Sequence, residues 1–286
     1  MNGKTKMVSM VALVSVAMAV IRTVIIQYDM EKNDIEAKTY YLPDNAEVTV
    51  FTVAVFAFIA LFAFCAIMYG RGQRVMLNRA YGATPAGSLT LAFALIGAAS
   101  VYIAEILRGG RESVTVIGIL ILVTTLLSAV KFIISGVRYD KTLKNNYHAL
   151  AAVAPVAFCI FRLLGDFIRS SAAPLASSGA YHIVGLCTTL LFFLTEGKSY
   201  VVKTSGALYF LFGHLSVFFL LIYSVPNLFM NCFGLFEFDY YAAYSVADIG
   251  IAVYILTRLS SARFKKDVPE LDEQPEVCLP VDARPE

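Results

Sequence analysis

Eight long apolar runs follow one another along the chain, and the stretches between them hold most of the charged residues. A bilayer core of roughly 30 Å needs about 20 apolar residues in a helix, and each run approaches that length. The pattern predicts an all-α fold, a polytopic transmembrane helix bundle over residues 1–260. The predicted spans cover residues 7–26, 48–69, 86–107, 113–136, 148–168, 178–195, 205–225 and 241–258.

Basic residues favour one side of the predicted bundle. Fourteen Lys and Arg residues fall on the side that holds both termini, and five fall on the other. Because basic residues near short loops stay on the cytoplasmic side, we expect a multi-pass protein of the cell membrane with both termini in the cytoplasm. The segment from Gln27 to Glu47, with six carboxylates, is expected to face outward.

The first apolar run has a second interpretation. Lys4, Lys6 and the sequence Ala17-Met18-Ala19 resemble a secretory signal with its cleavage site. The apolar run continues to Ile26, so we favour a retained span. Cleavage would change the number of spans and leave the orientation of the other seven as stated.

Residues 261–286 form a different kind of segment. It is basic at first and then rich in proline, with seven carboxylates after residue 266. Such a segment cannot bury enough apolar surface to fold alone, so we predict a disordered acidic cytoplasmic tail. It is either a solvated end or a docking segment for a membrane or cytoplasmic protein partner.

Composition agrees with a lipid environment. The chain is 58% apolar with a mean hydropathy of +0.70, and its net charge is only +2. No basic stripe interleaved with aromatic residues occurs, which excludes nucleic acid as a partner. The expected partner is therefore the lipid bilayer, together with a small solute or ion if the bundle has a binding site.

Ionisable residues inside the predicted spans are the candidates for function, because a charge at the centre of a bilayer costs about 2.5–3.5 kcal/mol. Threading the spans in and out and counting residues from their ends places most of these side chains in the outer part of the membrane, with His214 near the midplane. This placement predicts a polar vestibule open to the outside. The candidate residues are Asp248, Arg162, Asp166, Arg22, His214, Glu105 and His182.

Arg162 and Asp166 lie four residues apart, on one face of a helix, and can pair within it. Such a pair is either structural or part of a site, and Arg22 and Arg162 can also extend toward outer headgroups. Pro155 is expected to kink the fifth span below the pair. Lys131 is expected to extend to the inner face.

Asp248 has no cation within reach on its own helix. It needs a partner from another span, and Arg162, Arg22 or His214 could serve. A buried carboxylate of this kind is typical of a proton or cation relay. Tyr244, near the start of the same span, is expected to belong to an interfacial aromatic belt, with an aromatic binding cage as the alternative.

No catalytic or cofactor motif is recognisable in the sequence. Gly197-Lys198-Ser199 lacks the glycine that a phosphate loop has five positions earlier, because Phe192 stands there. The three histidines have no metal-ligand spacing. We therefore expect no cofactor and no metal, and an enzyme is the least favoured of the functional classes considered below.

Two segments resemble a group of eight-span membrane proteins of anaerobic Gram-positive bacteria whose function is unknown. One runs from Arg22 to Glu31, and the other is Pro155 followed by Phe161–Phe167. The sequence departs from the group at Asn33-Asp34, where its members have Gly-Phe. The resemblance implies the eight-span topology and no activity. Arginines at similar depth in spans one and five also suggest a four-plus-four repeat.

Three functional hypotheses follow. The first is a small-solute or ion transporter with a proton-linked step at Asp248. The second is a non-catalytic membrane sensor or assembly subunit, in which the same charges are structural pairs. The third is a membrane enzyme acting on lipid-linked substrates, for which no nucleophile and base can be identified. A filled, dry bundle interior would favour the second.

Overall fold

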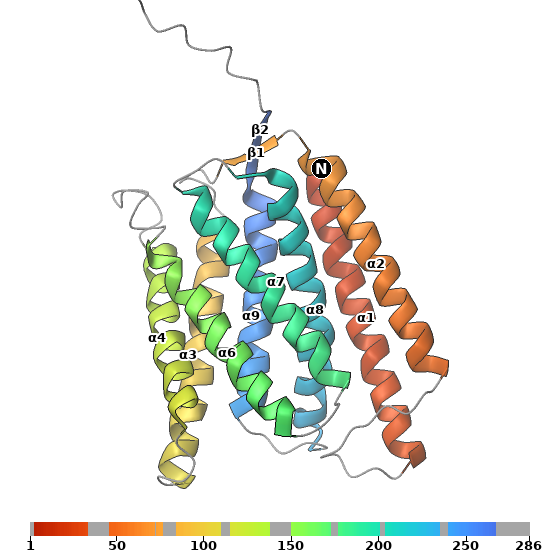
Figure 1. Cartoon of the computed structure of the whole chain (residues 1–286), viewed down its shortest axis with the longest axis vertical. Coiled ribbons are helices and arrows are strands. Elements are labelled where there is room, and N and C mark those ends of the chain that lie inside the picture. Colours follow the sequence, from red (N-terminus) through yellow and green to blue (C-terminus); the bar gives the residue numbers. More distant parts are fainter. Residues whose placement is uncertain are drawn as a thin grey trace, which may run out of the picture.

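The computed structural model describes residues 3–33, 46–71, 73–76, 84–109, 115–137, 150–172, 177–200, 204–234 and 240–266. Long helices dominate these ranges (Figure 1). The helices are α1 (Gly3–Asn33), α2 (Ala46–Gly70), α3 (Thr84–Gly109), α4 (Val116–Val137), α6 (Val153–Ala172), α7 (Ser177–Ser199), α8 (Gly206–Cys232) and α9 (Tyr240–Ser261). Two short strands accompany them, β1 (Gln73–Met76) and β2 (Arg263–Lys266).

These helices form an all-α polytopic membrane bundle. Within the described ranges, seven of the helices are long and apolar enough to cross a membrane. The eighth, α6, lies in the same bundle but carries Arg162, Asp166 and Arg169 among its 20 residues. The predicted fold class is therefore confirmed, and two of the three charges that set α6 apart, Arg162 and Asp166, are among the residues that the sequence marked as candidates for function.

The fifth helix differs from its prediction. It begins at Val153 instead of residue 148 and ends at Ala172 instead of 168. Pro155 lies in the first turn of α6, where a missing N–H is tolerated. Helical backbone also occurs at Leu150 and Ala151, and a turn at Ala152 separates it from α6. Helical structure is thus interrupted just before the proline, and the kink within the span stays a prediction, because residues 138–149 lie outside the described ranges.

Helix α8 lies at the centre of the packing. It contacts α1, α2, α7 and α9, while α3 packs against α4 and α9, and α6 links α4 to α7. The contact between α3 and α9 is close at Gly250, where an added Cβ would lie 2.9 Å from the Cβ of Ala94. The suggested four-plus-four repeat would require α6 to pack on α3 as α1 packs on α8. Among the described residues α6 makes no comparable contact with α3, so the packing does not follow that repeat.

The two strands join segments that are far apart in the sequence. They pair antiparallel, with Gln73 opposite Lys266 and Met76 opposite Arg263. The backbone N–H of Val75 also donates to the carbonyl of Thr204 at 3.1 Å. No pattern in the sequence predicted this two-stranded pairing. It lies at the same end of the bundle as the start of α1, and we call this the strand end (Figure 1).

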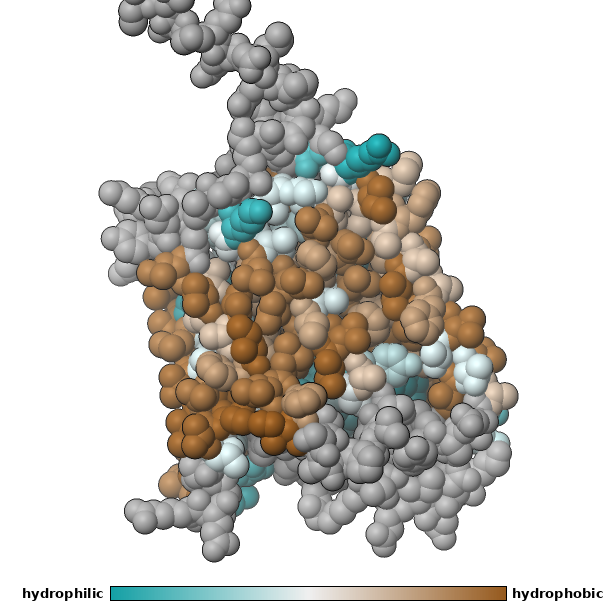
Figure 2. Space-filling model, viewed as in Figure 1, coloured by the Kyte–Doolittle hydropathy of each residue, from teal (hydrophilic) through white to brown (hydrophobic). Residues whose placement is uncertain are grey.

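The surface of the bundle matches a lipid environment. Figure 2 shows a broad hydrophobic band with hydrophilic residues toward the two ends. Within the band, large apolar side chains point outward: Leu13 is 72% exposed and Phe93 is 71% exposed. Water would oppose such exposure, whereas acyl chains do not, so the exposed side chains indicate contact with the lipid bilayer.

Candidate functional site

Two groups of buried polar side chains lie toward opposite ends of the bundle. The Arg162 cluster, toward the end away from the strands, consists of Arg162, Asp166, His182, Ser224 and Asp248. The Glu196 cluster, toward the strand end, consists of Lys131, Glu196, Tyr200, Tyr209, Tyr254 and Arg258.

Four helices supply the Arg162 cluster. Arg162 and Asp166 come from one face of α6, His182 from α7 and Asp248 from α9. Ser224, from α8, donates a long hydrogen bond of 3.4 Å to Asp248 Oδ2. Four of the seven candidate residues therefore meet in one place, although they are up to 86 positions apart in the sequence.

Arg162 and Asp248 form the central ion pair. Arg162 Nη1 donates to Asp248 Oδ1, and Nη2 donates to Oδ2 at 3.1 Å. This two-point arrangement matches the planar fork of the guanidinium to both carboxylate oxygens. The partner that Asp248 needs thus comes from α6. Arg162 is directed to Asp248 instead of to Asp166 on its own helix, since the carboxylate of α9 lies deeper in the bundle.

His182 connects the ion pair to the second carboxylate. Its Nδ1 lies 2.7 Å from Asp166 Oδ2, close enough for an ion pair when the ring is protonated. Its Nε2 lies 3.0 Å from Arg162 Nη2, a donor, and 3.1 Å from Asp248 Oδ2, an acceptor. A neutral ring can accept from Arg162 at Nε2, whereas a protonated ring can donate to Asp248. The protonation state therefore selects the partner of Nε2.

Aromatic rings enclose these groups. The Tyr223 ring stacks on His182 with 4.1 Å between centroids, and the Arg162 guanidinium lies 4.9 Å from the centroid of Tyr244. Tyr244 is 2% exposed and its hydroxyl lies 3.1 Å from Thr125 Oγ1. The aromatic-belt interpretation of Tyr244 is wrong, because this side chain packs against the buried arginine and not at the membrane surface.

The Arg162 cluster is closed rather than open. The side chains of Arg162, His182 and Asp248 are at most 5% exposed, and only Asp166, at 18%, has notable contact with the surroundings. The described residues therefore form no open vestibule around these charges, because the charges bind one another and the tyrosines cover them. With a neutral imidazole, one arginine faces two carboxylates and the cluster carries one excess negative charge.

Arg22 does not belong to this cluster, and its side chain binds the backbone of α8 instead. Its Nη1 donates to the carbonyl of Ile222 at 2.8 Å, and its guanidinium lies 4.7 Å from the Tyr181 ring. Ile222 is four residues before Pro226, which lies inside α8. Since proline has no N–H, the carbonyl of Ile222 has no helical donor, and Arg22 supplies one. Arg22 therefore stabilises the part of α8 that carries Tyr223 and Ser224.

Two other candidates lie apart from the cluster. His214 is fully buried on α8 between the rings of Phe62 and Phe210, and neither ring nitrogen has a hydrogen-bond partner among the described residues. Glu105 is half-buried on α3 and makes no contact with Arg162, His182 or Asp248. His214 is thus not the partner of Asp248 that the sequence allowed.

The Glu196 cluster was not among the sequence candidates. Glu196 Oε1 accepts from Arg258 Nε at 2.5 Å and from the Tyr254 hydroxyl at 2.8 Å. Arg258 Nη2 also donates to the Tyr200 hydroxyl at 2.6 Å. In the sequence, Glu196 lies just beyond the predicted sixth span, and Arg258 counts as a cytoplasmic end residue. In the structure α7 continues to Ser199, so Glu196 lies within the helix. The side chains of Glu196 and Arg258 are both buried in the bundle.

Lys131 also differs from its prediction. The residue is only 9% exposed. Its Nζ lies 4.0 Å from the ring centroid of Phe132 and 5.5 Å from that of Tyr254. It points into the bundle instead of extending along the inner face. One signal in the sequence could have found the group: Tyr254 and Arg258 are four residues apart, so they share a helical face with buried Ile251 and Ile255.

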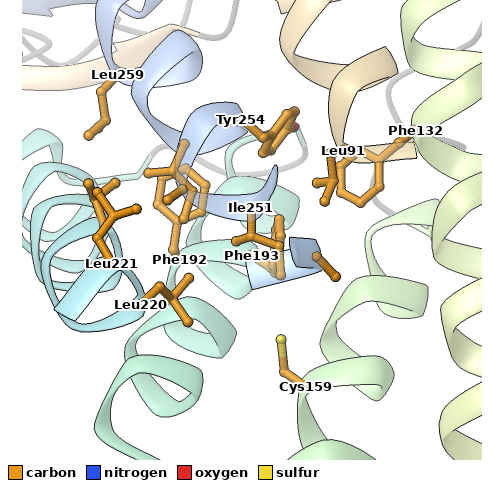
Figure 3. Packing of buried hydrophobic residues seen from close by; sticks show 14 of the residues in the cluster. Leu91, Phe132, Cys159, Phe192, Phe193, Leu220, Leu221, Ile251, Tyr254 and Leu259 are labelled. Carbon is orange, nitrogen blue, oxygen red and sulfur yellow. The ribbon is translucent and has the colours of Figure 1, made fainter. Parts of the chain in front are cut away.

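An apolar layer separates the two clusters. Asp248 and Arg258 are ten positions apart on α9, which corresponds to about 15 Å along the helix. Figure 3 shows Phe192, Phe193, Ile251 and Leu220 grouped near the centre of this core, with Cys159 at its edge. All five side chains are at most 1% exposed. Polar side chains thus meet toward each end of the bundle, with a hydrophobic barrier between.

Among the residues that the structure describes, no group of three or more His, Cys, Asp or Glu side chains is arranged to hold a metal ion. Comparison with known proteins adds no relative: no family model, no curated protein and no solved structure matches the chain.

Proposed function

We propose that this multi-pass membrane protein is a transporter of a small solute or ion with a proton-linked step in the Arg162 cluster. The observation that carries the proposal is the position of His182 Nε2, at almost equal distance from a donor on Arg162 and an acceptor on Asp248. A group whose partner changes with protonation can couple proton uptake to a rearrangement of four helices.

Exposure decreases from Asp166 through His182 to Asp248, which suggests the path of a proton into the cluster. Asp166 is 18% exposed and contacts His182 Nδ1, whereas Asp248, on the other side of the ring, is fully buried. A proton that enters at Asp166 would neutralise the excess negative charge of the cluster. Because a buried unpaired charge is costly in a bilayer, uptake of one proton or one cation stabilises the closed form.

The proton-linked step belongs to the outer side in this proposal. Fourteen basic residues against five favour a cytoplasmic strand end, with both termini in the cytoplasm. The Arg162 cluster would then lie in the outer half of the membrane. The helix segment around Pro226, which carries Tyr223 and Ser224, is the natural place for opening, since it lacks one backbone hydrogen bond.

Proton flux in liposomes tests the proposal. The full-length protein is reconstituted with the pH indicator pyranine inside, and amino acids, short carboxylates, K⁺ and Na⁺ are added outside in turn. We expect one class to cause a change in internal pH that His182→Gln and Asp248→Asn abolish. Thr195→Val, which alters a half-buried hydroxyl bonded only within α7, is the control and should keep the flux. Absence of any solute-dependent flux would refute transport.

The titration of His182 can be followed directly. The chain has only three histidines, so a spectrum with ¹⁵N-labelled imidazole rings contains three sets of signals, and His182→Gln identifies one. The proposal requires His182 to change from a neutral ring to a doubly protonated ring within the pH range of the flux. A ring that keeps one protonation state over that range would disprove the relay.

The apolar layer supports a second hypothesis, a non-catalytic sensor or assembly subunit. Phe192, Phe193 and Ile251 fill the space between the clusters and leave them as separate structural pairs. In that case Asp248→Asn would alter stability without any effect on solute movement. A co-purifying protein partner that is lost when residues 267–286 are deleted would favour this hypothesis over transport.

A further inference from the structure

We propose that the Glu196 cluster is a binding site for a small monovalent anion, such as chloride or a short carboxylate. The proposal concerns the strand end of the bundle and does not depend on transport or on His182. It is based on positive charge and hydrogen-bond donors that the other described residues leave unused.

The charge of the cluster is the first observation. Lys131 and Arg258 contribute two positive charges, and Glu196 contributes one negative charge. Their residues are between 1% and 9% exposed, so solvent screens the excess charge poorly. One bound anion with a single negative charge would neutralise the group, as a buried ion normally requires.

The ammonium of Lys131 is the second observation. It faces the rings of Phe132 and Tyr254, and it has no hydrogen-bond acceptor among the described residues. Glu196 attracts it electrostatically, but the two do not form an ion pair within 4.0 Å. An ammonium has three N–H donors, and all three are available here.

The hydroxyl of Tyr209 is the third observation. Tyr209 is fully buried on α8, it packs 5.0 Å from the Phe192 ring, and its hydroxyl has no partner among the residues described. The Phe192 ring in turn packs on Phe193, and Phe193 packs on Tyr254, so contacting rings connect Tyr209 to the side chain that donates to Glu196. A buried hydroxyl without a partner loses its hydration free energy and gains nothing in return. A ligand that accepts a hydrogen bond removes that cost.

These donors determine the class of ligand. An ammonium and a phenol both donate, and Arg258 Nη1 makes no hydrogen bond with a described residue. The ligand must therefore be an acceptor, and the single excess charge favours a monovalent anion over sulfate or phosphate. The surrounding rings of Phe132, Phe193 and Tyr254 favour a weakly hydrated or partly apolar anion.

Thermal stability in defined salts tests the site. The full-length protein in non-ionic detergent is placed in sodium gluconate, whose anion is bulky, and gluconate is exchanged for chloride, acetate or sulfate at constant ionic strength. We expect a saturable rise of the unfolding midpoint with chloride or acetate and none with sulfate. A rise that is equal in every salt, or no rise at all, would overturn the proposal.

Variants locate the effect. Lys131→Met should abolish the saturable rise, and Tyr209→Phe should weaken the apparent affinity about tenfold or more, since it removes one hydrogen bond to a charged ligand. Tyr244→Phe is the matched control, because it removes a hydroxyl from the other end of the bundle and should leave the rise intact. If Lys131→Met does not fold, Tyr209→Phe decides alone. An unchanged affinity in Tyr209→Phe would place the anion elsewhere and refute the site.

Discussion

The two buried clusters are each built around an arginine–carboxylate pair, but the groups added to that pair have opposite charge. Each has one arginine bound to one carboxylate, and α9 supplies one member of each pair, Asp248 in one case and Arg258 in the other. The Arg162 cluster adds a second carboxylate and an imidazole, whereas the Glu196 cluster adds a lysine and three tyrosines. One group carries excess negative charge and the other excess positive charge.

This difference indicates which event could change each cluster, protonation in one case and ligand binding in the other. In the Arg162 cluster, Arg162, His182 and Asp248 are already hydrogen-bonded, so change must come through a proton on His182. In the Glu196 cluster, Lys131 and Tyr209 have donors to spare, so change must come through a ligand. The two proposals therefore assign a proton to one end of the bundle and an anion to the other.

Removal of Arg162 should have the largest effect. Arg162→Met leaves Asp248 buried without its cation, and loss of one partner of a buried pair costs about 3–5 kcal/mol. We expect a large fall in the unfolding midpoint of the purified protein, or loss of folded protein. Adding Asp248→Leu should restore much of the stability, because the double variant no longer buries the Asp248 carboxylate without its cation.

The matched control for this cycle is Asp166→Leu. It removes the other carboxylate of the cluster, which contacts His182 and not Arg162. If Asp166→Leu rescues Arg162→Met as well as Asp248→Leu does, the assignment of the central ion pair is incorrect.

Glu196 provides the corresponding test at the strand end. Glu196→Gln leaves Arg258 and Lys131 without a carboxylate, and we expect a loss of about 2–4 kcal/mol, since the amide oxygen still accepts one hydrogen bond. Lys131→Met in the same protein should recover part of the loss by removing one cation. Chemical or thermal unfolding measures both. A Glu196→Gln protein as stable as the wild type would show that the Glu196–Arg258 pair does not stabilise the fold as the Arg162–Asp248 pair is expected to.

Arg22 offers a test of the helix segment that supports the Arg162 cluster. Arg22→Met should cost about 1–3 kcal/mol, because the carbonyl of Ile222 then lacks any donor in the bilayer. Pro226→Ala restores a backbone N–H to that carbonyl and should therefore rescue Arg22→Met. The unfolding midpoints of the two single variants and the double variant show whether Arg22 replaces the backbone donor that Pro226 lacks. Additive losses in the double variant would show that Arg22 acts in another way.

The smallest effect is expected at His214, a buried polar residue that belongs to neither cluster. His214→Phe keeps the aromatic packing between Phe62 and Phe210 and removes two buried nitrogens without partners. We expect a stability equal to that of the wild type or about 1 kcal/mol higher. His214→Ala is the control, because it leaves a cavity and should lose about 2–4 kcal/mol. A marked loss in His214→Phe would indicate a role for the imidazole that the packing does not explain.

Much of the candidate site could be predicted from the sequence. Arg162, Asp166, His182 and Asp248 are polar residues inside long apolar runs, and the cost of burying them makes each a reasonable candidate on its own. Their pairing could not be predicted, because it depends on which helices are neighbours. Arg162 has Asp166 four residues away on the same helical face, and only the approach of α9 brings Asp248 into a better position.

The sequence by itself determined the membrane helices, since hydrocarbon leaves no other way than a helix to satisfy the backbone of long apolar segments such as the seven that the described residues contain. The tertiary structure alone decided three things: the ion pair between α6 and α9, the second cluster at Glu196, and the strand pairing between Gln73–Met76 and Arg263–Lys266. Each depends on contacts between residues more than 60 positions apart. Helix formation is a local property of the chain, whereas the choice of partner for a buried charge follows from how the helices pack.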